Sequence, residues 1–139
     1  MKISASVKNS ENSNKIILST NGVEHELKVA PKAGGFGSSA NGGELLFLAL
    51  ATCYCNDIYR EAVKLGITVH AAEINVEGEL GAAGDPAKDI RYFARVKAKA
   101  SNEQIEALMK HTDKVAEIHN TLRQGIAVQL VGVEAIVLS

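Results

Sequence analysis

The sequence predicts an α+β fold, because strands and helices are grouped along the chain instead of alternating one by one. Apolar and polar residues alternate with a period of two before residue 30 and again between residues 67 and 100, which is typical of half-buried strands. Between these regions lies a stretch, residues 42–65, that is first apolar and then amphipathic, as expected of a long helix.

Three short strands with this alternation are expected near the N-terminus, over residues 2–8, 14–20 and 23–29. The dipeptide Asn21-Gly22 separates the second strand from the third. This dipeptide favours a type I′ turn, so the second and third strands are expected to form a hairpin. A loop rich in glycine and serine follows over residues 31–43 and ends the regular structure.

The central helix is expected to begin after Asn41 and to end near Leu65. Asn41 and Glu44 have the spacing of a capping box, and Gly66 suits the left-handed residue that follows a helix. The first half of this helix is apolar on every side, and 139 residues offer little structure to bury it. We therefore expect a second copy of the same helix to cover it, in an intimate homodimer.

The rest of the chain is expected to form two more strands, two helices and a closing extended segment. The strands cover residues 67–79 and 90–100, and the helices cover residues 102–115 and 118–123. The β-branched residues of 126–138 predict one or two final strands. Neither a repeat nor a linker divides the sequence, so a single domain over residues 1–139 is expected.

Composition argues against several classes of function. The chain has 15 basic and 16 acidic residues and a net charge of −1, which predicts no nucleic-acid partner. Its longest apolar run, 45–51, is far shorter than the roughly 20 residues of a membrane span. The N-terminus lacks the apolar core of a signal peptide. We therefore expect a cytoplasmic protein without a membrane partner.

Neither the glycine loop nor the histidines predict a cofactor or a metal. Gly35, Gly37 and Ala40 match the spacing of a dinucleotide fingerprint but lack the strand–turn–helix context that it requires. A loop or lid is the simpler interpretation. The four histidines and two cysteines do not have the spacing of zinc ligands. We expect no cofactor and no metal site.

The only two cysteines, Cys53 and Cys55, lie in the central helix. Residues two apart on a helix point about 200° from each other, so these thiols cannot form a disulfide while the helix is intact. An inert buried thiol is the simpler interpretation of each. A reactive Cys53 requires a nearby cation, and Arg60 lies seven residues later on almost the same face.

The segment ELLFLALATC, residues 44–53, resembles the central-helix signature of the OsmC/Ohr family of thiol-dependent proteins. The glycine loop before it, the Gly-Ile step at 66–67 and the Asn-Thr-Leu sequence at 120–122 also fit. The resemblance implies antiparallel sheets wrapped around a long central helix, in an interlaced homodimer with active sites between the subunits. It also implies a peroxidase reaction, in which Cys53 attacks a peroxide and becomes a sulfenic acid.

Three positions differ from the family pattern. The resolving cysteine of the family corresponds to Ala116, its activating glutamate corresponds to Gly43, and no arginine precedes Arg60. The resemblance therefore implies weak or altered peroxide activity, with an external thiol as reductant. The residues near Cys53 that are expected to tune its thiol are Arg60, Glu44, Glu117 and His119, with a Cys53–His119 pair as one hypothesis.

Two alternatives remain open at this point. The first is a non-catalytic dimer of the same fold that binds a small hydrophobic ligand in a pocket between subunits. The walls of such a pocket are expected to come from Phe36, Leu46, Phe47 and Ala49. The second is a purely structural scaffold.

Overall fold

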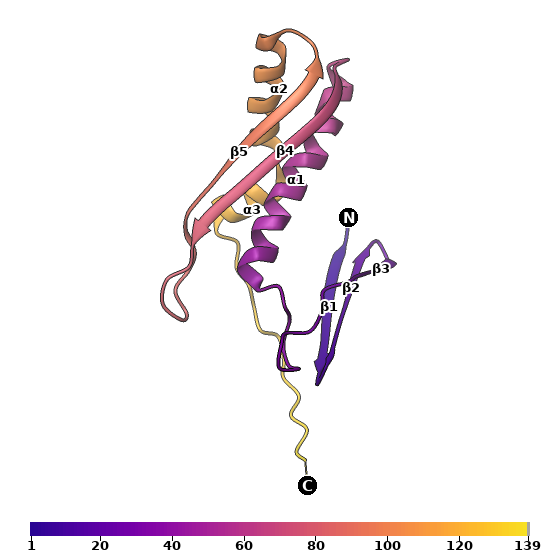
Figure 1. The fold of residues 1–139 in the computed structure, drawn as a ribbon, viewed down its shortest axis with the longest axis vertical. Coiled ribbons are helices and arrows are strands. Elements are labelled where there is room, and N and C mark those ends of the chain that lie inside the picture. Colours follow the sequence, from indigo (N-terminus) through magenta and orange to yellow (C-terminus); the bar gives the residue numbers. More distant parts are fainter. Residues whose placement is uncertain (139) are drawn as a thin grey trace. The chain divides into compact units, whose positions relative to one another are not determined.

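The computed structural model describes residues 1–138 and contains five strands and three helices in the order β1-β2-β3-α1-β4-β5-α2-α3 (Figure 1). The grouped order of strands and helices confirms the predicted α+β class. The elements form two compact units. One contains residues 1–48 and 78–89, and the other contains residues 49–77 and the chain from Ile90 onward.

The N-terminal strands form a three-stranded antiparallel sheet in the order β1-β2-β3. The bounds are Ile3–Ser10 for β1, Ser13–Thr20 for β2 and Val23–Leu27 for β3. Asn21 and Gly22 connect β2 to β3 with φ of 50° and 81°. Two positive φ angles are what a type I′ turn requires, so the predicted hairpin is confirmed.

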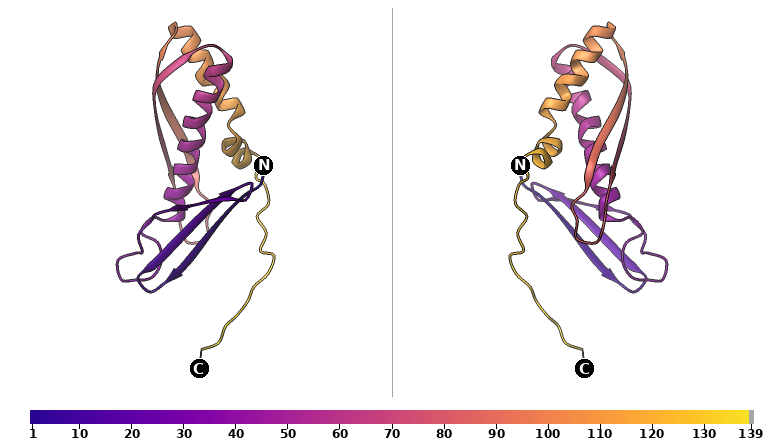
Figure 2. Two further views of the ribbon diagram at one scale, coloured as in Figure 1. Left: turned by 90° about the vertical axis from the view of Figure 1, so that its right-hand side faces the viewer. Right: turned by 90° about the vertical axis from the view of Figure 1, so that its left-hand side faces the viewer.

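Helix α1, Gly42–Lys64, is the long purple-to-magenta helix of Figure 2, and its bounds lie where the local signals predict. The Glu44 backbone N–H donates to Asn41 Oδ1 at 2.8 Å, and the Asn41 N–H donates to Glu44 Oε1 at 2.9 Å. Gly66 has φ of 67°, the left-handed conformation that follows many helices. None of the helices within residues 1–138 is long and apolar enough to cross a membrane.

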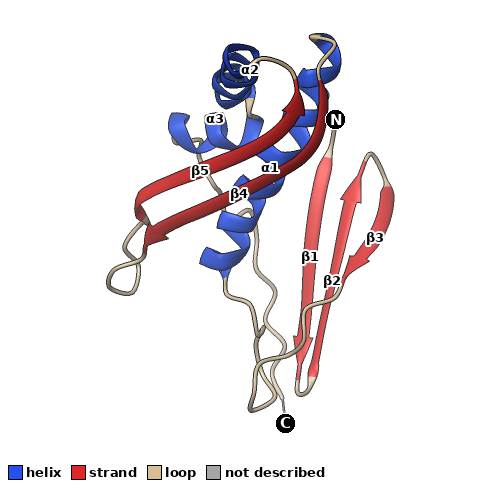
Figure 3. Ribbon diagram, turned by 45° about the horizontal axis from the view of Figure 1, so that its top comes forward, coloured by secondary structure: helices blue, strands red, loops and turns tan. Residues whose placement is uncertain are grey.

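The second unit has its own hydrophobic core. Strands β4, Thr68–Glu79, and β5, Lys88–Lys99, run in opposite directions as a two-stranded ribbon (Figure 3). Helices α2, Asn102–Val115, and α3, Glu117–Gln124, follow them. The Tyr54 hydroxyl donates to the Met109 carbonyl oxygen at 2.8 Å and so joins α1 to α2. The buried core cluster consists of Tyr54, Ile58, Ala62, Ile67 and Leu108.

The predicted strands over residues 126–138 are wrong. After Gly125, whose φ is 60°, this segment forms no regular secondary structure, and its side chains are exposed, up to 99% at Val128. The β-branched composition favours an extended backbone, but a strand also needs a neighbouring edge to accept and donate its hydrogen bonds. Within the described chain, the segment pairs with no strand of either sheet.

The apolar first turns of α1 are only partly covered in the single chain. Leu50 is buried, whereas Leu48 is 54% exposed and Leu45, Leu46 and Phe47 are half-buried. The predicted second copy of the helix would cover these residues. The homodimer therefore stays a prediction.

Candidate functional site

Cys53 lies on α1, and its thiol faces the beginning of α3. Cys53 Sγ donates to Asp57 Oδ2 at 3.6 Å, one turn later on the same helix. It also lies 3.9 Å from Glu117 Oε2, the first residue of α3. The backbone N–H of Ile118, the second residue of α3, lowers the pKa of this thiol. The first turn of a second helix therefore lies beside this thiol, a proximity that the sequence does not reveal.

Arg60 lies on the other side of the same two carboxylates. Its Nη1 atom is 3.0 Å from Asp57 Oδ1 and 2.9 Å from Glu117 Oε1. Each carboxylate thus has one oxygen near the Cys53 sulfur and the other paired with the Arg60 guanidinium. The thiol, two acids and a cation form one connected cluster, which we call the Cys53 cluster: Cys53, Asp57, Arg60 and Glu117.

Glu61 holds Arg60 in this position. Its carboxylate is 3% exposed and accepts hydrogen bonds from Arg60 Nε at 2.9 Å, Lys64 Nζ at 2.8 Å and His111 Nε2 at 2.8 Å. Hydrogen bonds from Lys64, Arg60 and His111 lower the pKa of Glu61 to about 2, and the bond from Lys64 has the largest effect. Because His111 belongs to α2, the same carboxylate also connects α2 to α1.

The surroundings of Cys53 favour the protonated thiol over the thiolate. Burial raises the pKa of Cys53 above its ordinary value, and the negative charges of Asp57 and Glu117 raise it further against the opposing Ile118 N–H. Burial also raises the pKa of Asp57, with a further contribution from Glu117, while Arg60 acts in the opposite direction. The Asp57 carboxylate, whose pKa is raised, therefore lies beside the thiol and can accept its proton. Arg60 balances part of the negative charge of Asp57 and Glu117.

The structure brings Cys53, Arg60 and Glu117 together, as the sequence interpretation expects. Asp57 and Glu61 are additional members that this interpretation missed. Their signal was present, because positions 53, 57, 60 and 61 recur on one face of a helix. The carboxylate of Glu44 instead accepts the Asn41 N–H and caps the start of α1.

His119 does not pair with Cys53, so that hypothesis is wrong. Its ring is 4% exposed, and neither nitrogen has a hydrogen-bond partner within the described chain. The ring packs edge-on against Tyr92, with the two centroids 4.8 Å apart. Residues two apart on a helix point about 200° from each other, so with Glu117 at the thiol, His119 faces away from it.

The two cysteines are free and lie in different surroundings. Cys55 borders a hollow of about 250 Å³ together with Ala72 and Ile74 of β4, whereas Cys53 faces α3. This placement agrees with the prediction that the intact helix prevents a disulfide between them. Ala116, at the position of the family's resolving cysteine, is fully buried and offers no second sulfur.

The donor atoms of Cys53, Asp57 and Glu117 lie within 4.8 Å of one another, a spacing that could hold a metal ion. The guanidinium of Arg60 already pairs with both carboxylates. A divalent metal would have to displace this cation, so the cluster is better suited to a thiol assisted by acids and an arginine than to a metal centre.

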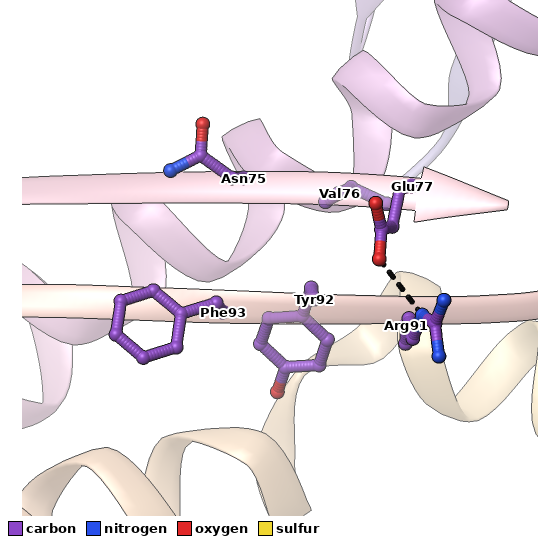
Figure 4. Close-up of a pocket in the computed structure, with 6 residues that line it drawn as sticks. All are labelled: Asn75, Val76, Glu77, Arg91, Tyr92 and Phe93. Atoms are coloured by element: carbon purple, nitrogen blue, oxygen red, sulfur yellow. Dashed lines mark hydrogen bonds and ion pairs between the residues drawn. The ribbon is translucent and has the colours of Figure 1, made fainter.

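Another hollow, of about 370 Å³, lies on the β4–β5 ribbon (Figure 4). Arg91 Nε and Glu77 Oε1 pair across the two strands at 2.8 Å, and both side chains are at least 70% exposed. This surface contains none of the residues of the Cys53 cluster.

Comparison with known protein families matches residues 35–131 to the family described as OsmC-like protein. Similar solved structures include an OsmC-like protein from Mycoplasma pneumoniae, 22% identical, with a TM-score of 0.58 and coverage of 88% of this chain and 89% of that one. An organic hydroperoxide resistance protein from Elizabethkingia anophelis is 17% identical, with a TM-score of 0.59 and 90% coverage of both chains.

The organic hydroperoxide resistance protein OhrB of Bacillus subtilis is 19% identical, with a TM-score of 0.52 and coverage of 88% of this chain and 92% of that one. At these identities the likeness shows the fold, which is the one that the sequence resemblance implies. A search of curated protein sequences found no match.

Proposed function

Because the chain belongs to the OsmC family, we propose that it is a thiol-dependent peroxide reductase in which Cys53 is the attacking residue. The observation that carries this proposal is the Cys53 cluster, where the sulfur lies 3.6 Å from an acid that is itself paired with Arg60. Two of the similar solved structures are named organic hydroperoxide resistance proteins. An organic hydroperoxide is therefore the proposed substrate.

The reaction begins with transfer of the Cys53 proton to Asp57, the nearer of the two carboxylates. The Ile118 N–H stabilises the thiolate that forms. The sulfur attacks the terminal oxygen of the hydroperoxide, so that an S–O bond forms and the O–O bond breaks. Sulfur loses two electrons and becomes a sulfenic acid, and the leaving alkoxide takes up a proton and becomes an alcohol.

The proposed activity is slow near neutral pH. The raised pKa of Cys53 leaves little thiolate at pH 7, and the thiolate is the nucleophile. The rate is therefore expected to rise with pH until Cys53 is fully ionised. This behaviour would distinguish the chain from an enzyme whose thiol is ionised at neutral pH.

An external low-molecular-weight thiol completes the cycle. The sequence has no third cysteine, and Cys55 borders the hollow at β4. The external thiol attacks the sulfenic acid, which releases water and leaves a mixed disulfide on Cys53. A second external thiol then breaks this bond, restores the Cys53 thiol and leaves as the oxidised disulfide. Such thiols are abundant in a reducing cytoplasm, where we place the reaction.

We also propose that the functional unit is a homodimer. The support is the exposed apolar surface of the single chain, which includes Leu48 on α1 and the segment 126–138. An extended β-branched segment of this kind gains hydrogen bonds and apolar contacts when it pairs with a strand of another copy. The alternative of a non-catalytic ligand-binding dimer has less support, because it leaves the acids and the cation beside Cys53 without a role.

The test compares Cys53→Ser with Cys55→Ser, two identical changes on different faces of one helix. Cumene hydroperoxide consumption is measured with excess dithiothreitol and is corrected for the reaction in buffer. We expect Cys53→Ser to remove all consumption above buffer and Cys55→Ser to retain it. Full consumption by Cys53→Ser, or none by the unaltered chain at any pH, would contradict the proposal.

A further inference from the structure

A cavity of about 230 Å³ lies in the second unit, where α1, β5 and α3 meet. Its walls are mainly apolar and carry two nitrogen-containing side chains. None of the polar groups of the Cys53 cluster borders it. The lining residues are Leu50, Ile90, Tyr92, His119, Leu122 and Arg123.

His119 is the unusual member of this wall. It is 4% exposed, and both ring nitrogens lack a hydrogen-bond partner among the residues that the structure describes. More than nine in ten buried polar groups in proteins have a partner, because an unpaired buried donor or acceptor is costly. A ring with two unpaired nitrogens at the edge of a cavity therefore points to a molecule that occupies the cavity.

The polar side chains beside the ring make their hydrogen bonds to other groups, and none is paired with His119. The Tyr92 hydroxyl donates to Asp113. Arg123 Nη2 donates to Asp113 Oδ1 at 2.7 Å, and its Nη1 donates to the Asp113 carbonyl at 3.0 Å and to Asn120 Oδ1 at 3.1 Å. The hydrogen bonds of this set therefore point toward Asp113 and Asn120 and leave both His119 nitrogens unpaired within the described chain.

Charge and size define the class of ligand. Burial lowers the pKa of His119, and the charge of Arg123 lowers it further, so the ring is neutral, with one donor and one acceptor nitrogen. Asp113 balances the charge of Arg123. The cavity therefore favours a neutral molecule, and a hydroxyl group suits the ring because it can donate to one nitrogen or accept from the other. A cavity of about 150 Å³ is enough for benzene, so a single ring with a hydroxyl fits.

We propose that this cavity is a binding site for a small, neutral, mainly apolar molecule with a hydroxyl group, of the size of a phenol. Its hydroxyl bonds to His119, and its apolar body lies against Leu50, Ile90 and Leu122. The site is separate from the peroxide chemistry proposed for Cys53, and Cys53→Ser is expected to leave it intact.

The probes are phenol, toluene and benzoate, titrated into the full chain. Toluene has the shape of phenol without its hydroxyl, and benzoate carries a negative charge. Imidazole signals are followed by NMR and affinities by calorimetry. We expect phenol to shift the His119 signals saturably and to bind about fivefold more tightly than toluene, the effect of one neutral hydrogen bond. Benzoate is expected to bind no more tightly than toluene.

The matched variants are His119→Phe and His70→Phe, since His70 is exposed on β4. The first is expected to remove the preference for phenol over toluene, and the second to preserve it. If His119→Phe does not fold, Leu122→Trp replaces it. Leu122 is 42% exposed, so a larger side chain there can fill the cavity and is expected to abolish binding of both probes.

Equal binding of phenol and toluene to the unaltered chain would overturn the proposal. The proposal would also be overturned if phenol left the His119 signals unchanged. This outcome includes the case in which a second copy of the chain supplies the missing hydrogen-bond partner. Retained phenol binding in Leu122→Trp would place the probe elsewhere and overturn it as well.

Discussion

Replacing Asp57 with asparagine separates the two effects that this side chain has on Cys53. The substitution keeps the shape but removes a negative charge 3.6 Å from the sulfur and a proton acceptor. Two unit charges about 4 Å apart interact by roughly 4 kcal/mol at an effective dielectric constant of about 20. Arg60 lies 3.0 Å from the same carboxylate and cancels much of this effect. We expect the pKa of Cys53 to fall by about one unit, which corresponds to roughly 1.4 kcal/mol.

The same substitution is expected to slow peroxide reduction at pH 7. A lower pKa gives about tenfold more thiolate, but loss of a positioned general base costs roughly 100-fold or more. The net result is a rate about tenfold below that of the unaltered chain. Above the pKa of Cys53 the base is no longer needed, so the two rates are expected to converge.

The assay measures the pH dependence of iodoacetamide alkylation and of peroxide consumption, both in a Cys55→Ser background with one reporter thiol. Asp113→Asn is the control, because Asp113 pairs with Arg123 and Tyr92 and does not contact the sulfur. The reasoning is refuted if Cys53 ionises at the same pH with and without Asp57. A rate deficit of equal size at every pH would assign Asp57 a structural role only.

Three other substitutions test separate parts of the structure. The pKa of Glu61 is about 2 when folded against an ordinary 4.5, so its contribution to stability is present above pH 4.5 and is lost as the pH falls toward 2. Glu61→Gln is expected to reduce the change in melting temperature between pH 4.5 and pH 2, and an unchanged pH profile would contradict this expectation. Tyr54→Phe removes the hydrogen bond to the Met109 carbonyl, which keeps its helical partner in α2, and is expected to cost about 1 kcal/mol in urea unfolding; an equal or higher midpoint would show that this bond contributes nothing. Ala116→Cys places a thiol next to the residue that contacts Cys53, so one equivalent of peroxide is expected to produce an intramolecular disulfide, whereas two free thiols after oxidation would count against the geometry.

Local signals in the sequence predicted the parts of the fold that depend on neighbouring residues. Asn41 and Glu44 marked the start of α1, and the turn at residues 21–22 marked the β2–β3 hairpin. Cys53 and Arg60 were placed on one helix face by their spacing alone. These features need only the helical period, a capping pair or a turn dipeptide, and none depends on a distant segment.

The missed features depend on tertiary contacts. The first turn of α3, with Glu117, lies beside Cys53 only because α3 packs beside α1, and no local pattern encodes that contact. The residues of 126–138 have the composition of a strand but pair with no described strand of the single chain. At Gly43, an added Cβ would lie 2.7 Å from the Leu80 side chain, so the position expected for an activating glutamate has no room for one unless Leu80 shifts.

The most direct test of the proposed peroxide chemistry is mass spectrometry of the full chain after one equivalent of cumene hydroperoxide, with dimedone present to trap sulfenic acid. We predict the dimedone adduct on Cys53 and an unmodified Cys55, with more adduct at pH 9 than at pH 7. An adduct formed first on Cys55, or two unmodified thiols after the peroxide has been consumed, would contradict the role assigned to the Cys53 cluster.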